Sequence, residues 1–253
     1  MSNHLSMRSG NPALSAETFK GVTISSDEVM TINGTVNKTA ISLLILIAAG
    51  TFTFSGNYNW LIFPGFIGGF IVAIITIFKK EWSPITVPIY AFLKGLALGA
   101  VSQIYENELA PADGSFDGIV SQAILLTLGI LFSLLFAYKT KIIAATENFK
   151  LGVFAATAGI AVFYIVSFVV SFFTGSYPEV LNPLNGGLMS IGVSLFIVVI
   201  ASLNLVLDFD FIEEGAEKGA PKYMEWFGAF GLLVTLVWLY LEILRLLAKL
   251  RSR

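Results

Sequence analysis

Seven long apolar runs, separated by short polar segments, make up most of the chain. Each run approaches or exceeds the roughly 20 residues that a helix needs to cross the hydrocarbon core of a bilayer. The pattern predicts an all-α integral membrane protein, a bundle of seven transmembrane helices. The runs lie near residues 39–54, 60–78, 85–105, 118–138, 151–173, 186–207 and 227–247.

The first 38 residues have a different character from the rest. They are polar, rich in Ser, Asn and Thr, and lack the apolar core and small-residue cleavage site of a signal peptide. We therefore expect two parts: a flexible cytoplasmic tail at residues 1–38 and a seven-helix transmembrane domain at residues 39–253.

Composition supports a membrane protein and excludes several functions. Of 253 residues, 56% are hydrophobic and only 13% charged, and the mean hydropathy is +0.81, so surplus apolar surface must face lipid. A net charge of -2 without a basic stripe excludes nucleic acid as a partner. The absence of cysteine and the single histidine, His4, argue against disulfides, thiolate chemistry and histidine metal sites. We expect no resident cofactor.

Charge asymmetry between the loops predicts the orientation. Seven spans place most basic residues on the side of the N-terminus, and the opposite loops carry acidic residues alone. The positive-inside rule therefore predicts a cytoplasmic N-terminus. Four basic residues that follow Glu242 in the sequence conflict with this rule. They are Arg245, Lys249, Arg251 and Arg253. The last helix is either re-entrant or a full crossing whose charges are tolerated outside, and we favour the crossing.

Small residues recur at four-residue spacing in the second and third runs. Gly65 and Gly69 form one such pair, and Ala91, Gly95 and Gly99 form a series. This spacing lets helix backbones approach closely. It is equally consistent with the general frequency of glycine in membrane helices.

Ionisable residues at membrane depth need a reason to be there, because each costs roughly 2.5 to 3.5 kcal/mol at a helix centre. Glu242 shares a helical stripe with Gly228, Gly231 and Thr235, so it is predicted to face protein. The alternative is a surface ion pair with Arg245 one turn further on.

Asp208 and Asp210 are predicted to point in different directions. Asn204 lies one turn before Asp208 on the same face, whereas Asp210 is rotated by about 200°. We expect Asp208 to point inward, and Asp210 to begin a solvated acidic turn that continues to Glu217.

Lys94 falls near mid-membrane in the third run, where it must snorkel, deprotonate or find a carboxylate. No partner is evident from the sequence. Glu106 is interpreted as an ordinary residue of the membrane boundary.

Three segments in this order resemble the Bax inhibitor-1 family, also called TMBIM or YccA-like. They are LDFDFI at Leu207–Ile212, WLYLEILRLL at Trp238–Leu247, and YAFLKGLALGA at Tyr90–Ala100 after the basic Lys79-Lys80. The resemblance covers residues 39 to 253. It implies a bacterial inner-membrane protein that is a pH-sensitive calcium leak, with six helices around a central seventh, and it implies no enzymatic activity.

In that family a pair of carboxylates on the last two helices shares a proton and gates the leak. By motif position these are Asp208 and Glu242, supported by Asn204, Asp210, Lys94 and Arg245. Two buried carboxylates cannot both ionise cheaply, so such a pair titrates as a unit, and when deprotonated it could bind Ca²⁺.

Three features depart from the family pattern. Glu242 replaces the usual aspartate, the Glu213–Glu225 loop looks longer than usual, and the second run has glycine where some relatives have an acidic residue. A simple hairpin turning near Lys218 would place Asp208 opposite about Gly228 rather than Glu242.

The sequence is also consistent with one other function and disfavours another. A regulator of a membrane protease or another membrane complex could use residues 1–38 to hold its partner. An intramembrane protease is disfavoured, because the chain has neither a Gly-x-Gly-Asp nor a Gly-x-Ser-Gly motif, and the Asp208–Asp210 pair lacks further acidic support for metal-phosphate chemistry.

Overall fold

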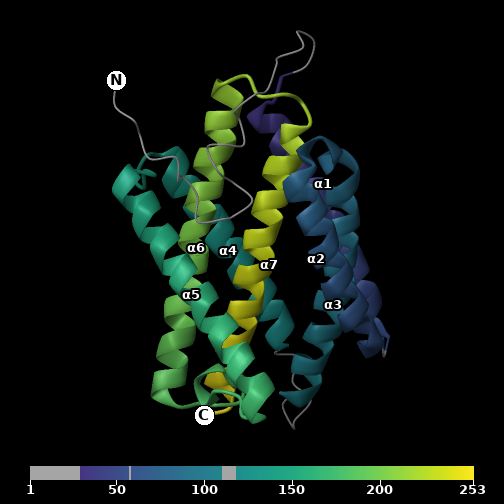
Figure 1. The fold of residues 1–253 in the computed structure, drawn as a ribbon, viewed down its shortest axis with the longest axis vertical. Helices are drawn as coiled ribbons and strands as arrows, with labels where there is room; N and C mark the ends of the chain where they lie inside the picture. Colours follow the sequence, from purple (N-terminus) through teal and green to yellow (C-terminus); the bar gives the residue numbers. More distant parts are fainter. Residues whose placement is uncertain (1–28, 57, 110–117) are drawn as a thin grey trace.

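The computed structural model describes residues 29–56, 58–109 and 118–253, and this part of the chain forms seven long α-helices that run back and forth along one axis (Figure 1). All seven are long and apolar enough to cross a membrane, which confirms the predicted fold class. The helices are α1 (Ile32–Ser55), α2 (Ile62–Phe78), α3 (Ser83–Glu108), α4 (Ile119–Lys139), α5 (Glu147–Thr174), α6 (Leu188–Glu217) and α7 (Met224–Arg251). Short 3₁₀ turns are η2 (Asn59–Leu61), η3 (Lys80–Trp82) and η4 (Glu179–Leu181).

α7 is the central helix, as predicted. It is the most buried of the seven and contacts α1, α3, α4 and α6. α2 and α5 are the least buried, and each lies mainly against one neighbour, α3 and α6 respectively. α7 is also continuous over 28 residues, a length that fits a full crossing.

α1 begins earlier than the sequence pattern predicted. Its first residue is Ile32, so residues 32–38 belong to a helix and not to the predicted tail. Thr31 caps the helix by accepting a hydrogen bond from the Gly34 N–H at 3.0 Å. The tail itself, residues 1–28, lies outside the described residues.

A buried carboxylate explains why the helix starts at this point. Glu225, at the beginning of α7, is fully buried and accepts hydrogen bonds from the Thr31 amide at 3.0 Å and hydroxyl at 2.8 Å. Lys222 Nζ lies 3.1 Å from the same Glu225 oxygen. The start of α1 is therefore fastened to the start of α7.

Close backbone approach joins α3 to both α1 and α2. A Cβ added at Gly99 would lie 2.0 Å from the Gly50 carbonyl oxygen, and one at Gly95 would lie 2.3 Å from that of Leu46. On the other side, a Cβ at Gly65 would lie 2.7 Å from the Leu93 carbonyl oxygen. These glycines are needed for helix packing, so the packing interpretation of their spacing is the correct one.

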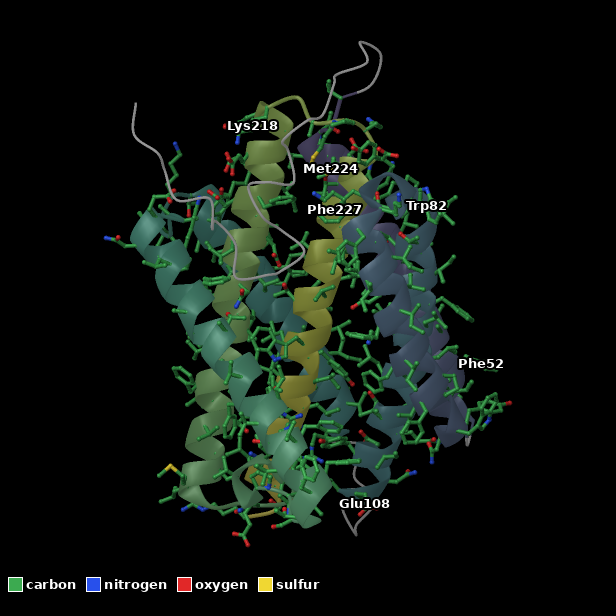
Figure 2. The ribbon with its side chains drawn as sticks, viewed as in Figure 1. Phe52, Trp82, Glu108, Lys218, Met224 and Phe227 are labelled. Atoms are coloured by element: carbon green, nitrogen blue, oxygen red, sulfur yellow. The ribbon has the colours of Figure 1, made fainter. Side chains whose placement is uncertain are left out.

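The connection between α6 and α7 is shorter than predicted. α6 continues through Glu217, so Asp210 to Glu217 form helix rather than an acidic turn. Lys218 and Met224 flank the loop at one end of the bundle, and Glu108 lies at the other end (Figure 2). Gly219 adopts a left-handed φ of 64°, which lets the chain reverse within a few residues.

Candidate functional site

Polar side chains occur at every seventh residue along one face of α5. Lys150, Thr157 and Tyr164 are each separated by two helical turns, so they share a face. Each contacts a polar group on α6 or α7. These three residues and their partners Asp210, Asn204 and Glu242 are called here the α5 polar seam.

The three contacts of the α5 polar seam are short. Lys150 Nζ lies 2.6 Å from Asp210 Oδ2, Asn204 Nδ2 donates to Thr157 Oγ1 at 2.8 Å, and Tyr164 donates to Glu242 Oε1 at 2.7 Å. The apolar packing beside them centres on Ile160 with two α6 isoleucines, and partly buried residues such as Trp238 of α7 pack against it. Polar bonds thus accompany a small apolar cluster where α5 meets the bundle.

Glu242 is buried and paired with a cation. It is 2% exposed, and Arg245 Nη1 donates to its two carboxylate oxygens at 3.0 and 2.9 Å. The same Nη1 lies 2.7 Å from the Tyr164 hydroxyl, so the three side chains form a closed network between α5 and α7. The inward orientation is confirmed. The alternative partner, Arg245, is present as well, but the pair is largely buried rather than a surface pair, since the Arg245 side chain is 22% exposed and that of Glu242 3%.

Asp208 is fully buried, as predicted, but it lies at a different depth in the bundle from Glu242. The Cβ position of Gly228 lies 3.1 Å from Ile212, which fixes the register of α6 against α7. Asp208 lies about one helical turn from this contact along α6. Glu242 lies about four turns from it along α7, in the same direction along the bundle. At 1.5 Å per residue the two levels differ by about 15 Å. In this conformation the structure does not bring the two carboxylates together.

Asn204 points inward with Asp208, since it bonds to Thr157 and to the Ile200 carbonyl oxygen at 2.8 Å. Asp210 was predicted to be solvated, and its side chain is 25% exposed, but it is also paired with Lys150, whose side chain is only 7% exposed. The prediction missed this partner on α5. α6 contacts α4, α5 and α7, so protein covers more than one of its faces.

Lys94 lies apart from the α5 polar seam. Its ammonium group is 4.8 Å from the centre of the Phe66 ring and 5.8 Å from that of Tyr90, a cation–π arrangement between α2 and α3. Gly69 leaves the space for its stem, because a Cβ there would lie 2.9 Å from Lys94 Cε. Lys94 is thus stabilised by aromatic rings, which the sequence analysis did not consider.

Glu106 has a local structural role. Its Oε2 accepts a hydrogen bond from the Val120 N–H at 3.1 Å, in the first turn of α4. A carboxylate at a helix N-terminus is favourable, because it satisfies an unpaired N–H and complements the helix dipole. Glu106 therefore connects the end of α3 to the start of α4.

Two of the C-terminal basic side chains make contacts inside the protein. Lys249 is fully buried and donates to the carbonyl oxygens of Val180 at 2.6 Å and Ser190 at 3.2 Å. Arg245 is bound to Glu242. These two contacts reduce the conflict with the positive-inside rule, because two of the four C-terminal basic side chains are bound inside the protein.

Sequence reasoning missed Lys150, Thr157, Tyr164 and Lys249. For the first three a signal was available, namely the seven-residue spacing of polar groups in an apolar helix. Lys249 offered none, because its partners are backbone carbonyls of another segment. Among the described residues no three His, Cys, Asp or Glu side chains gather in a way that could hold a metal ion.

One comparison with known proteins identifies the chain. The family model described as Bax inhibitor 1 like matches residues 11–252, nearly the whole sequence. The chain belongs to the Bax inhibitor 1 like family. No curated protein and no solved structure gives a match. Family membership agrees with the seven-helix bundle and extends the resemblance seen in the sequence to residues ahead of Thr39.

Proposed function

We propose that this Bax inhibitor 1 like protein is a pH-sensitive cation leak, with Ca²⁺ as the permeant ion and Asp208 and Glu242 as its titrating groups. The observation that supports it is the burial of both carboxylates, each at most 2% exposed, on adjacent helices of an apolar bundle. Carboxylates at such depth are costly and typically mark ion pathways or proton relays.

The α5 polar seam is the proposed route. It supplies oxygen atoms from Asp210, Thr157, Tyr164 and Glu242 along one face of α5, and oxygen is the ligand that Ca²⁺ prefers. α5 is among the least buried helices, so a small outward movement costs little apolar contact. Such a movement would expose these oxygens to water one after another across the membrane.

Protonation of Glu242 is the proposed trigger. In the structure its carboxylate binds Arg245 and Tyr164, and these bonds fasten α5 to α7. Adding a proton removes the charge that Arg245 binds, which weakens the connection. Asp208 is the second proposed titrating group. The leak should therefore increase as the pH falls.

Calcium flux into proteoliposomes containing a trapped dye tests the proposal. The wild-type protein should leak faster than empty vesicles, and more so at acid pH. Glu242→Gln should leak several-fold faster at neutral pH and lose most of its pH dependence, because its side chain is permanently uncharged. Asp208→Asn should shift the pH profile of the leak.

Glu108→Gln is the matched control, since Glu108 is exposed at the end of α3, and its pH profile should equal that of wild type. If the wild-type protein and both buried variants leak no faster than empty vesicles, the proposed channel function is wrong.

The alternative function is regulation of a membrane protease through residues 1–38, and its test is a deletion within this tail. Met30 donates to the Ala220 carbonyl oxygen at 2.6 Å and Thr31 caps α1, so deletion through residue 38 would damage the bundle. A deletion that ends at residue 28 removes only residues outside this contact. Unchanged co-purifying partners after this deletion would count against a regulatory tail.

A further inference from the structure

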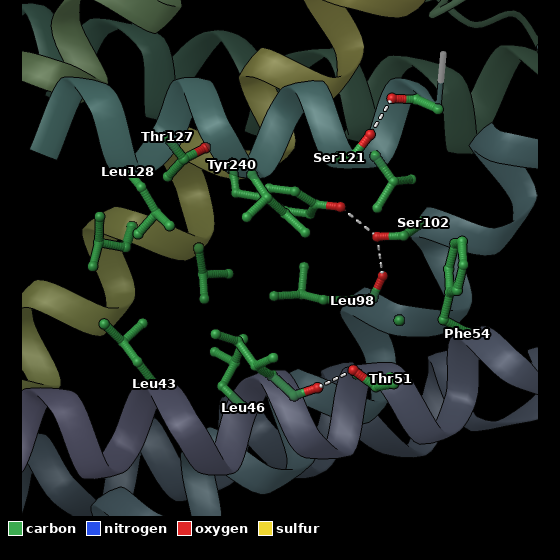
Figure 3. Close-up of a pocket in the computed structure, with 18 of the residues that line it drawn as sticks. Leu43, Leu46, Thr51, Phe54, Leu98, Ser102, Ser121, Thr127, Leu128 and Tyr240 are labelled. Carbon is green, nitrogen blue, oxygen red and sulfur yellow. Dashed lines mark hydrogen bonds between the residues drawn. The ribbon is translucent and has the colours of Figure 1, made fainter. Parts of the chain in front are cut away.

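A large cavity lies between α1 and α4. Its volume is about 570 Å³, within the roughly 300 to 1,000 Å³ typical of ligand sites. α1, α3, α4 and α7 contribute its walls (Figure 3). The cavity occupies the half of the bundle that contains the end of α3 and the start of α4.

The cavity is accessible from the lipid. Ile47 on α1 and Ile124 on α4 line it and are 50% and 42% exposed, so they form the two edges of a lateral opening. Leu236 and Val237 of α7 line it from the buried side. Both edges belong to transmembrane helices, so the opening faces bilayer hydrocarbon and a ligand would enter from the membrane.

The walls do not suit an ion. Thr51 and Thr127 are polar, but their hydroxyls donate to the carbonyl oxygens of Ile47 and Ala123 in their own helices, at 2.9 and 2.7 Å. The remaining walls of the deep part are leucine, isoleucine and valine, with the glycines Gly50 and Gly99. A cation entering this part would lose its water without gaining ligands, so the cavity is separate from the proposed ion route.

Polar groups gather at the shallow end. Ser102 and Tyr240 share a hydrogen bond of 2.5 Å, and Glu106 and Ser121 lie among the lining residues at the end of α3 and the start of α4. Leu43 and Leu128 line the deep part, about two turns or more into α1 and α4. The cavity is thus polar near the membrane surface and apolar further into the bilayer. This matches a phospholipid whose headgroup lies at the surface and whose acyl chain points inward.

We propose that this cavity binds one acyl chain of a membrane phospholipid, which enters between α1 and α4 with its headgroup at the Glu106 end. Glu106 provides a negative charge there, and the Ser121 hydroxyl, which donates to the Gly118 carbonyl oxygen at 2.8 Å, is still able to accept a hydrogen bond. This end favours a headgroup that carries an ammonium donor, as in phosphatidylethanolamine, over an anionic headgroup. The site is built from α1, α3, α4 and α7, and does not depend on the proposed leak.

Photo-crosslinking of the full-length protein tests the site. The protein is reconstituted in vesicles of phosphatidylcholine and phosphatidylethanolamine that contain a trace of phosphatidylethanolamine with a diazirine near the end of one acyl chain. After irradiation, mass spectrometry should find adducts on inward cavity residues such as Leu98 and Val237, which are 5% and 8% exposed. Adducts confined to outward-facing side chains would overturn the proposal.

Two adjacent substitutions on α4 provide a matched pair. Ile124→Trp places a large ring at the opening and should reduce the Leu98 and Val237 adducts several-fold. Leu125→Trp places the same ring at a position that is 70% exposed and outside the cavity, and should leave them unchanged. Equal labelling in the two variants would overturn the proposal. Equal labelling by an anionic phosphatidylglycerol analogue would overturn the headgroup assignment.

Discussion

Replacement of Arg245 by methionine should lower the free energy of unfolding by about 3 to 5 kcal/mol, the cost of removing one partner from a buried ion pair. The remaining Glu242 side chain is only 3% exposed and would keep Tyr164 as its hydrogen-bond donor without a compensating cation. Unfolding of the purified protein in detergent, followed by circular dichroism, measures the loss.

The double variant Glu242→Met with Arg245→Met distinguishes the ion pair from packing. It removes both charges together and should recover most of the lost stability, since apolar replacement of a whole buried pair is often neutral. Arg253→Met, at an exposed position, is the control and should match wild type. A double variant that is as unstable as Arg245→Met would show that side-chain packing, and not charge pairing, is what the arginine provides.

Gly99→Val should separate α1 from α3 and lower stability by about 1 to 3 kcal/mol or more, the range for overpacked interiors. Even the first added carbon would lie 2.0 Å from the Gly50 carbonyl oxygen and 2.1 Å from Thr53 Oγ1. The obstructing atom is backbone, so the helices themselves must move. The thermal midpoint of unfolding in detergent is the measurement.

Gly129→Val on α4 is the matched control for this steric effect. A Cβ at Gly129 meets nothing within 4 Å, so the same substitution in a transmembrane helix should change the midpoint little. If both variants behaved alike, helix propensity rather than the α1–α3 contact would explain the loss at Gly99.

Local sequence patterns predicted the features that depend on a single helix. The lengths of the apolar runs predicted the seven helices. The stripe of residues that contains Thr235 predicted which face of α7 points inward, and Glu242 is buried on this face. The four-residue spacing of Gly95 and Gly99 indicated close packing, but not which helix would be the neighbour. That neighbour is α1, which is distant in the chain.

Features that depend on two distant segments were predicted wrongly or missed. Helical periodicity shows that Asp210 faces away from Asp208, but not that α5 covers that face with Lys150. The start of α1 at Ile32 depends on Glu225, which lies 194 residues from Thr31. The relative depth of Asp208 and Glu242 is an exception, because a hairpin turning near Lys218 already placed Asp208 away from Glu242, and α6 does end there.

The contact between Thr31 and Glu225 has a consequence for biosynthesis. Six helices enter the membrane before the ribosome has made the one that fills their centre, and α1 lacks the carboxylate that fixes its first turn until α7 begins. Helices can insert individually and associate afterwards. Here the final association depends on the last segment to be translated, so a nascent chain released before Met224 would leave six inserted helices around an empty core. Such a truncated product should be a substrate for membrane quality control.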